Sequence, residues 1–273
     1  GANIVAREAD LVIAIGTRLS DFTTASKTAF QNPDVKFIAI NVAEFDAAKH
    51  GALPLVGDAR VVLEELSDAV QGYRVSDELT QRVAKYNGEW EAEVERIYNL
   101  GHRPILSQGE VIGAVNEGSA PNDVMVCAAG SMPGDLHKLW RTRNPKGYHL
   151  EYGYSCMGYE IAGGMGIKMA DPDREVYVMV GDGSYLMMAQ EIATSVQEGV
   201  KLNIVLVDNH GFASIGGLSK GVGADEFGTK YRMRNAQTGQ LDGENVPTDL
   251  AANAESLGAY VLRPEGKEGL MKA

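Results

Sequence analysis

The sequence predicts an α/β fold built from two three-layer units whose sheets are mainly parallel. Short apolar runs rich in β-branched residues recur along the 273 residues, and several of them end at Gly, Asp or Asn. Runs of this length and composition are typical of strands buried in a parallel sheet. Stretches with helical apolar spacing follow them, and this alternation of strand and helix is the signature of an α/β fold.

Residues 1–72 form the first predicted unit. Strands are expected at 10–16, 36–42 and 53–58, followed by a helix at 59–71. The turn after the first strand, Gly16-Thr17-Arg18, lacks the full glycine pattern of a dinucleotide site. We therefore expect this unit to be a structural spacer that does not bind FAD.

Residues 73–103 are charged with a sparse apolar stripe, which predicts a linker helix packed on a neighbour. Residues 104–273 form the second predicted domain. A helix capped by Ser107 reaches about residue 117, a strand follows at 124–130, and further strands are expected at 175–180, 202–207 and 260–262. The chain begins without Met and stops within a helical pattern, so we expect a piece of a longer polypeptide whose second domain is truncated at its C-terminal end.

The strongest local signal is Gly181-Asp182-Gly183-Ser184 directly after the strand at 175–180. Asn209 follows the next strand, and a helix is expected between them at 185–200. Successive parallel strands deliver both residues to the same carboxyl edge of the sheet, where open α/β sheets bind their ligands.

The residue types at this edge fit a metal-bound diphosphate. Gly181 and Gly183 allow a sharp turn and close approach of a ligand, and a following helix favours an anion at its N-terminus. The side chains of Asp182 and Asn209 offer hard oxygen ligands that, with a backbone carbonyl, suit Mg²⁺. The turn Gly130–Gly134, also expected after a strand, is a further candidate for contact with the ligand.

Composition limits the classes of partner. The net charge of −12 argues against nucleic acid or an anionic membrane, because either would need a basic patch. The two cysteines, Cys127 and Cys156, give no disulfide framework, which fits a cytoplasmic protein. No apolar run approaches the ~20 residues that span a bilayer.

The segment 181–211 resembles the motif of thiamine-diphosphate enzymes, in which Gly-Asp-Gly is followed by Asn-Asn beyond the next strand. This chain has Asp208-Asn209 at that position, which leaves the role of Asp208 open. The resemblance implies thiamine diphosphate and Mg²⁺ as cofactors, and it identifies 1–72 as part of the middle domain and 104–273 as the diphosphate-binding domain of an acetolactate-synthase-like enzyme.

The resemblance also implies the residues of the site. The Ser155 carbonyl would accept a hydrogen bond from the aminopyrimidine, and Met157 would hold the cofactor bent. The metal ligands would be Asp182, Asn209 and Gly211. The full set of cofactor-binding residues is Gly130, Ser131, Met132, Ser155, Met157, Gly181, Asp182, Gly183, Ser184, Asn209, Gly211 and Phe212.

The catalytic residue is not assigned. In the family, the glutamate that activates the cofactor comes from an N-terminal domain, usually of a partner subunit, and nothing in 1–273 corresponds to that domain. His210 is the one candidate within this chain. We therefore expect the chain alone to be inactive, and the complete protein to be a homodimer or homotetramer.

Three stretches, 151–160, 208–212 and 227–232, resemble the hydrolases of inositol breakdown that open a trihydroxylated cyclohexane-1,2-dione. Acetolactate synthases carry Leu-Pro where this chain has Glu160-Ile161, which also favours the hydrolases. The implied reaction opens the small polyhydroxylated dione to 5-deoxyglucuronate, and His210, Ser214 and Glu160 are candidates for substrate contact. The alternatives are an acetolactate-synthase-like carboligase and, from another class, a non-catalytic cofactor-binding module.

Overall fold

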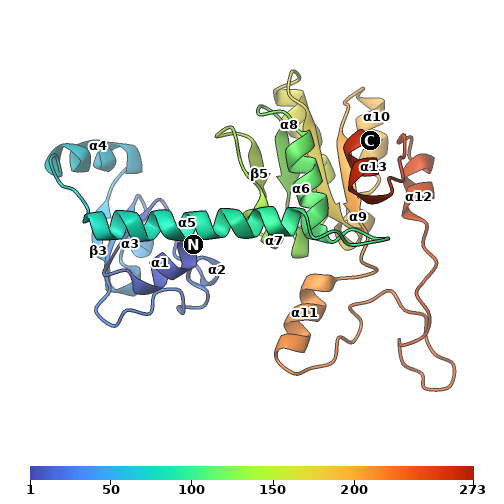
Figure 1. Cartoon of the computed structure of the whole chain (residues 1–273), viewed down its shortest axis with the longest axis horizontal. Helices are drawn as coiled ribbons and strands as arrows, with labels where there is room; N and C mark the ends of the chain where they lie inside the picture. The colour runs from blue at the N-terminus through green and yellow to red at the C-terminus, as the bar shows by residue number, and fades with distance from the viewer. The chain divides into compact units, whose positions relative to one another are not determined.

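The computed structural model describes residues 1–273, which form two compact units, Gly1–Val94 and Glu95–Ala273. Each unit has its own parallel sheet, with three strands in the first and four in the second (Figure 1). Helix α5 (Asp77–Tyr98) runs across the boundary between the units. The chain is therefore an α/β protein with two parallel sheets, as predicted. None of its helices combines the length and apolar character that crossing a membrane requires.

The sheet of the first unit has the order β1-β2-β3, and all its pairings are parallel. Its strands are β1 (Leu11–Ile15), β2 (Lys36–Asn41) and β3 (Leu53–Val56), close to the three predicted strands. The helical segments are α1 (Ala2–Glu8), α2 (Asp21–Thr24), α3 (Glu44–Ala47), the short 3-10 helix Lys49–Gly51 and α4 (Ala59–Ala69).

One face of the first sheet is covered, and the other is open along the edge strand β1, although Ile40 of the central strand β2 is buried on it. Ala14 of β1 and Ala39 of β2 lie in a small buried cluster. Leu11, Ile13 and Ile15 alternate with Ala14 along β1 and are 43–46% exposed. Because parallel sheets are normally covered on both faces, this apolar face is a surface on which another layer can pack.

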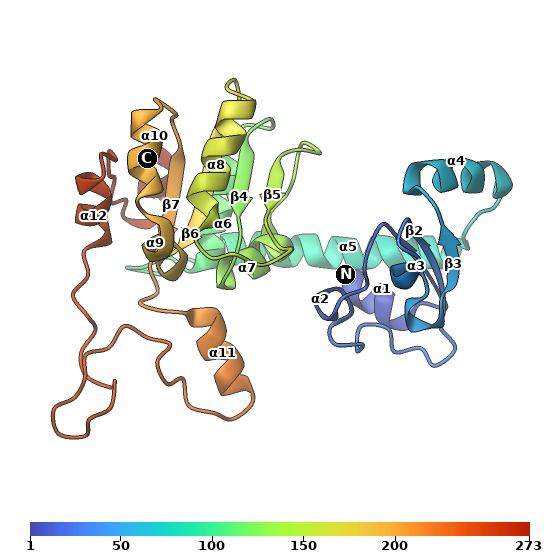
Figure 2. The same cartoon turned by 180° about the vertical axis from the view of Figure 1, so that it is seen from behind.

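The sheet of the second unit has the order β5-β4-β6-β7 and is also wholly parallel. Its strands are β4 (Val124–Cys127), β5 (Tyr148–Leu150), β6 (Val176–Gly181) and β7 (Asn203–Val207). Helix α8 lies in front of this sheet in Figure 2, with α6 behind it. The helices are α6 (Gln108–Gly118), α7 (Ser131–Leu139), α8 (Tyr159–Ala170), α9 (Asp182–Met188), α10 (Glu191–Gln197), α11 (Ala213–Gly221), α12 (Leu250–Ser256) and α13 (Gly266–Lys272).

The core of the second unit is formed by β-branched side chains of the central strands. Val126 of β4 and Val178 of β6 are fully buried. Gly164 of α8 packs directly on β6, since a Cβ at this position would lie 2.5 Å from Val178 Cγ2 and 3.5 Å from Val176 Cγ1. The absence of a side chain therefore lets the helix approach the sheet closely.

Several local predictions were wrong. The helix expected at 185–200 begins earlier, at Asp182, and is divided into α9 and α10. Gly130–Gly134 is not a free turn, because α7 begins at Ser131. The strand expected at 260–262 pairs with no other strand, and Tyr260 is 89% exposed. The short strand β5 was missed, since three residues carry too little periodicity to be recognised.

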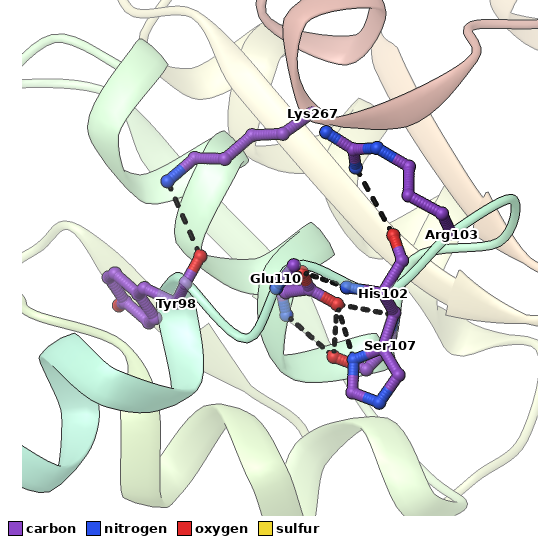
Figure 3. Close-up of polar contacts among 7 residues, drawn as sticks. Tyr98, His102, Arg103, Ser107, Glu110 and Lys267 are labelled. Atoms are coloured by element: carbon purple, nitrogen blue, oxygen red, sulfur yellow. Dashed lines mark hydrogen bonds and ion pairs between the residues drawn. The ribbon is translucent and has the colours of Figure 1, made fainter.

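A buried glutamate organises the start of α6 (Figure 3). Glu110 is 2% exposed, and its Oε1 accepts hydrogen bonds from the backbone N–H of Gly101 at 2.7 Å and of His102 at 3.1 Å. Its Oε2 lies 2.9 Å from both the backbone nitrogen and the hydroxyl of Ser107 and 3.0 Å from Nδ1 of His102. Ser107 is thus the N-cap of α6, as predicted. Glu110 extends the capping hydrogen bonds to the backbone of Gly101 and His102 in the preceding turn.

A lysine near the C-terminal end of the chain fastens α13 to the same region (Figure 3). Lys267 Nζ donates to the Tyr98 carbonyl at 3.3 Å and to Asn99 Oδ1 at 2.9 Å, and it lies 3.0 Å from Glu117 Oε2. These contacts join α13 to the end of α5 and to α6 within the second unit.

Candidate functional site

The two segments that carry the predicted motif leave the sheet side by side. Gly181 of β6 is the register partner of Val207 of β7, so Asp182 and Asp208 begin their segments at the same level of the sheet edge. This is the carboxyl edge, where open α/β sheets bind ligands. The pairing agrees with the expectation drawn from strand order.

Asp182 is buried at the centre of this edge, with 1% of its surface exposed. Its Oδ1 accepts a hydrogen bond from the Gly183 N–H at 2.9 Å, and its Oδ2 accepts one from the Gly211 N–H at 2.8 Å. The carboxylate therefore holds the start of α9 and the loop after β7 together. Each oxygen keeps a further acceptor position, so the group can also face a cation.

A second carboxylate lies beside it. Burial raises the pKa of Asp182, and the neighbouring side chain of Asp208 raises it further, while the backbone N–H groups of Gly211 and Gly183 lower it. Two carboxylates that disfavour each other's charge are the usual surroundings of a bound cation. Asp208, whose role the sequence left open, thus belongs to the site.

Asn209 and His210 occupy the outer part of the loop after β7. Asn209 is exposed, and its side chain makes no hydrogen bond within the chain. His210 Nδ1 lies 3.2 Å from Asp208 Oδ1, and its ring is 57% exposed. The predicted ligand Asn209 is therefore free to turn toward a ligand, whereas His210 is held by Asp208.

The backbone at position 211 can accommodate only glycine. Its φ is 154°, and a Cβ there would lie 2.2 Å from the Thr229 carbonyl oxygen. This close approach comes from a short antiparallel pairing, in which Phe212 N donates to the Thr229 carbonyl at 2.7 Å and Tyr231 N to the His210 carbonyl at 3.0 Å. The excursion of the chain after α11, residues 222–245, therefore returns to the loop after β7.

Three of the predicted cofactor residues meet at one point. A Cβ on Gly183 would lie 2.8 Å from the ring of Phe212 and 3.2 Å from Met157 Cε. The absence of a side chain at Gly183 thus lets Phe212 and Met157 pack directly on it, and the close approach of a ligand stays a prediction. The other expected reason, a sharp turn, is wrong, because Gly181 has φ −83° and ψ 159°, and Asp182 and Gly183 already belong to α9.

The segment after β4 contributes Gly130, Ser131 and Met132. Gly130 has φ 92° and ψ −155°, a conformation open to glycine, and nothing lies within 4 Å of its Cβ position. Ser131 donates to Gln108 Oε1 at 3.4 Å, and Met132 is 2% exposed. The space beside Gly130 is therefore open, whereas Met132 packs in the core.

The loop before α8 carries Ser155 and Met157. Ser155 has a left-handed φ of 54°. Glu151 holds this loop, since its carboxylate accepts the N–H groups of Tyr154 at 3.0 Å and of Cys156 at 2.8 Å. The Ser155 conformation is thus fixed by backbone hydrogen bonds on both sides.

Two buried hydroxyl groups near this edge have no hydrogen-bond partner, those of Ser184 and Tyr231. Burial, together with the charges of Asp182 and Asp208, raises the pKa of Tyr231 to about 12. The Tyr231 ring meets that of Phe212 edge-on, with centroids 5.6 Å apart. Tyr231 is a site residue that neither spacing nor periodicity could identify, because it stands in an irregular segment far along the chain.

The other candidate residues are buried or do not contact Asp182. Glu160, expected to contact a substrate, is 1% exposed and bonded to backbone. Ser214, also expected to contact a substrate, lies in α11. His137 packs near Tyr148, and His149 Nε2 lies 2.8 Å from the Tyr159 hydroxyl. None of these residues reaches Asp182 through a hydrogen bond.

No group of three or more His, Cys, Asp and Glu side chains could hold a metal ion. A cation at Asp182 would therefore need amide, carbonyl, phosphate or water oxygens as its remaining ligands, which is how Mg²⁺ is usually bound. A cavity of about 180 Å³ lies within the excursion; its lining is Glu226, Phe227, Gly228, Lys230, Arg232, Leu241 and Asp242.

Comparison with known proteins gives two family matches. Residues 128–273 match the thiamine pyrophosphate enzyme C-terminal TPP binding domain, and residues 1–66 match the thiamine pyrophosphate enzyme central domain. The whole chain is 44% identical to proteins named 3D-(3,5/4)-trihydroxycyclohexane-1,2-dione hydrolase from Bacillus cereus (strain AH820) and Bacillus thuringiensis (strain Al Hakam). It covers 46% of each, and thus spans about half the length of these curated relatives. The first match includes β6, β7 and the segments that follow them, so the chain belongs to the thiamine pyrophosphate enzyme family.

Proposed function

We propose that this chain is the cofactor-binding part of a thiamine-diphosphate-dependent hydrolase that opens 3D-(3,5/4)-trihydroxycyclohexane-1,2-dione to 5-deoxyglucuronate. The observation that carries this proposal is the 44% identity to hydrolases of that name along the whole chain. In this assignment, 1–72 is part of the middle domain, 73–103 a linker helix and 104–273 the diphosphate-binding domain.

The residues at the sheet edge fit the cofactor and Mg²⁺. Asp182, Asn209 and the Gly211 carbonyl would hold the metal, and the buried Asp182 carboxylate, with the exposed Asp208 carboxylate beside it, supports a cation there. When bound, thiamine diphosphate supplies the nucleophile and electron sink for cleavage of a C–C bond beside a carbonyl. The role left to the residues of this chain is to bind the cofactor and to orient it.

The contacts of the predicted residues suggest how that orientation arises. Because Gly183 has no side chain, Phe212 and Met157 pack directly on the start of α9, which places Met157 at the edge where a cofactor ring would bind. Gly130 offers open space beside the β4 edge, and the Ser155 carbonyl lies in the loop that Glu151 holds. The remaining members of the proposed set are Ser131, Met132, Gly181 and Ser184.

The complete protein is proposed to be a cytoplasmic homodimer or homotetramer without FAD. Cys127 and Cys156 are both free, which fits a reducing compartment. We assign no residue of this chain to activation of the cofactor, and we expect no turnover from the 273 residues alone.

The test is an assay of the complete polypeptide with the cyclic dione and, separately, with pyruvate. Consumption of the dione with formation of 5-deoxyglucuronate is expected. Turnover of pyruvate without opening of the dione would instead identify a carboligase. Absence of either reaction in a protein shown to bind the cofactor would point to a binding module and contradict the proposal.

A further inference from the structure

Glu160 is a buried carboxylate that bridges two of the segments at the sheet edge. It is the second residue of α8 and is 1% exposed. Its Oε2 accepts a hydrogen bond from the Gly158 N–H at 2.9 Å, and its Oε1 accepts one from the Ala129 N–H at 3.3 Å. One side chain therefore joins the end of β4 to the loop that precedes α8.

Both hydrogen bonds are made beside predicted cofactor residues. Ala129 immediately precedes Gly130, and Gly158 immediately follows Met157. Gly158 has a φ of 91°, and a Cβ on it would lie 2.5 Å from Met188 Cγ of α9. The loop that Glu160 holds is thus also packed closely against the helix that begins with Asp182.

The ionisation of Glu160 reflects this position. Burial raises its pKa, whereas the backbone N–H groups of Ala129 and Gly158 and the hydroxyl of Ser184 lower it. The Ser184 oxygen is close enough to act on the carboxylate but makes no hydrogen bond of ordinary geometry. A buried carboxylate is costly unless backbone donors compensate it, so its retention here calls for a structural reason.

We propose that Glu160 is a positioning residue for the cofactor site. Its carboxylate fixes the distance between the Ala129–Gly130 segment and the Met157–Gly158 loop, so that Met157 stands over Gly183 before the cofactor arrives. This inference rests on the proposed cofactor site but not on which substrate is converted. It assigns Glu160 a role different from contact with substrate, for which the side chain is too deeply buried.

The test uses Glu160→Gln in the complete polypeptide. Gln has nearly the same shape, but its amide group faces one of the two backbone N–H groups with hydrogen atoms instead of a lone pair. We expect faster hydrogen exchange at the Ala129 or Gly158 amide in the cofactor-free protein. We also expect the dissociation constant for thiamine diphosphate, measured by calorimetry at saturating Mg²⁺, to rise about tenfold.

Glu175→Gln is the matched control. Glu175 precedes β6 at the opposite end of the sheet and is bonded to Lys201 and Asn203, both at 2.9 Å. The Glu175→Gln variant should have a lower melting temperature and an unchanged dissociation constant for thiamine diphosphate. Equal loss of cofactor affinity in both variants at equal melting temperature would show a general structural effect and overturn the proposal.

Glu160→Asp provides a second variant that keeps the charge. Its carboxylate is set back by one methylene group and cannot reach both N–H groups. A folded Asp variant with wild-type affinity and wild-type amide exchange would contradict the proposal. Failure to open the dione while Glu160→Gln still weakens cofactor binding would contradict the proposed substrate alone.

Discussion

Replacing Glu110 by Gln is expected to destabilise the second unit in a way that depends on pH. Burial of the Glu110 carboxylate raises its pKa, but the N–H and hydroxyl of Ser107, the Gly101 N–H and the His102 side chain outweigh this and hold the pKa at about 2 (Figure 3). The ordinary value is 4.5. Folding therefore favours the ionised form.

The magnitude follows from this difference. Each unit of pKa shift corresponds to 1.36 kcal/mol, so the ionised carboxylate contributes roughly 3 kcal/mol to the free energy of unfolding at neutral pH. The contribution is complete above the unfolded pKa of 4.5 and is lost as pH falls toward 2. Counting hydrogen bonds gives a similar value, since Gln leaves about two donors without an acceptor at 1–3 kcal/mol each.

The assay is urea unfolding followed by the fluorescence of Trp140. The chain has two tryptophans, and a Trp90→Phe background leaves Trp140, in the second unit, as the single reporter. The free energy of unfolding of Glu110→Gln should be about 3 kcal/mol lower than that of the parent at pH 7. At pH 3 the difference between the two free energies of unfolding should be smaller by about 2 kcal/mol.

Glu117→Gln is the control on the same helix. Glu117 is 37% exposed and pairs with Lys267 alone, so its loss should cost less than about 1 kcal/mol. A gap between Glu110→Gln and the parent that is small at pH 7, or that does not change between pH 7 and pH 3, would refute the reasoning.

Three further substitutions test the packing of the site and of the sheet. Gly183→Ala should weaken thiamine diphosphate binding in calorimetry, because its Cβ would lie 2.8 Å from the Phe212 ring and 3.2 Å from Met157 Cε and would displace these two proposed cofactor contacts. Gly164→Ala should lower the free energy of unfolding by about 1–3 kcal/mol, since its Cβ would lie 2.5 Å from Val178. Tyr231→Phe should leave thermal stability unchanged or slightly higher, because the buried hydroxyl it removes has no partner.

Gly166→Ala is the control for the two glycine variants. Gly166 lies within α8 with nothing within 4 Å of its Cβ position, so Ala should be stabilising by about 0.5–1 kcal/mol. Unchanged cofactor affinity in Gly183→Ala, unchanged stability in Gly164→Ala, or a loss above about 1 kcal/mol in Tyr231→Phe would each contradict the corresponding contact.

The elements that the sequence could predict are those with strong local patterns. The strands at 124–127, 176–181 and 203–207 carry β-branched apolar runs, buried in the first two and half-buried in the third, and Ser107 with Glu110 forms a capping box that sequence can show. The position of Asp182 at the sheet edge followed from strand order alone, because parallel strands end at the same edge.

The features that could not be predicted depend on contacts between distant segments. Tyr231 meets Asp182 and Asp208 only because 229–231 pairs with 210–212, and no periodicity in an irregular segment indicates such a pairing. Glu160 looked like a surface carboxylate available to substrate, and its burial depends on how α8 lies on the sheet. The pattern at 260–262 resembled a strand, but apolar residues form a strand only where a partner is present.

The central claim is that Asp182 and the loop after β7 hold Mg²⁺ and the diphosphate. Its most direct test is calorimetric titration of Asp182→Ala in the complete polypeptide with thiamine diphosphate, with and without Mg²⁺, beside Glu198→Gln as a control on an exposed carboxylate. The account predicts that the Mg²⁺-dependent binding seen in the parent and in the control is abolished in Asp182→Ala. Binding of unchanged affinity and unchanged Mg²⁺ dependence in a folded Asp182→Ala protein would contradict it.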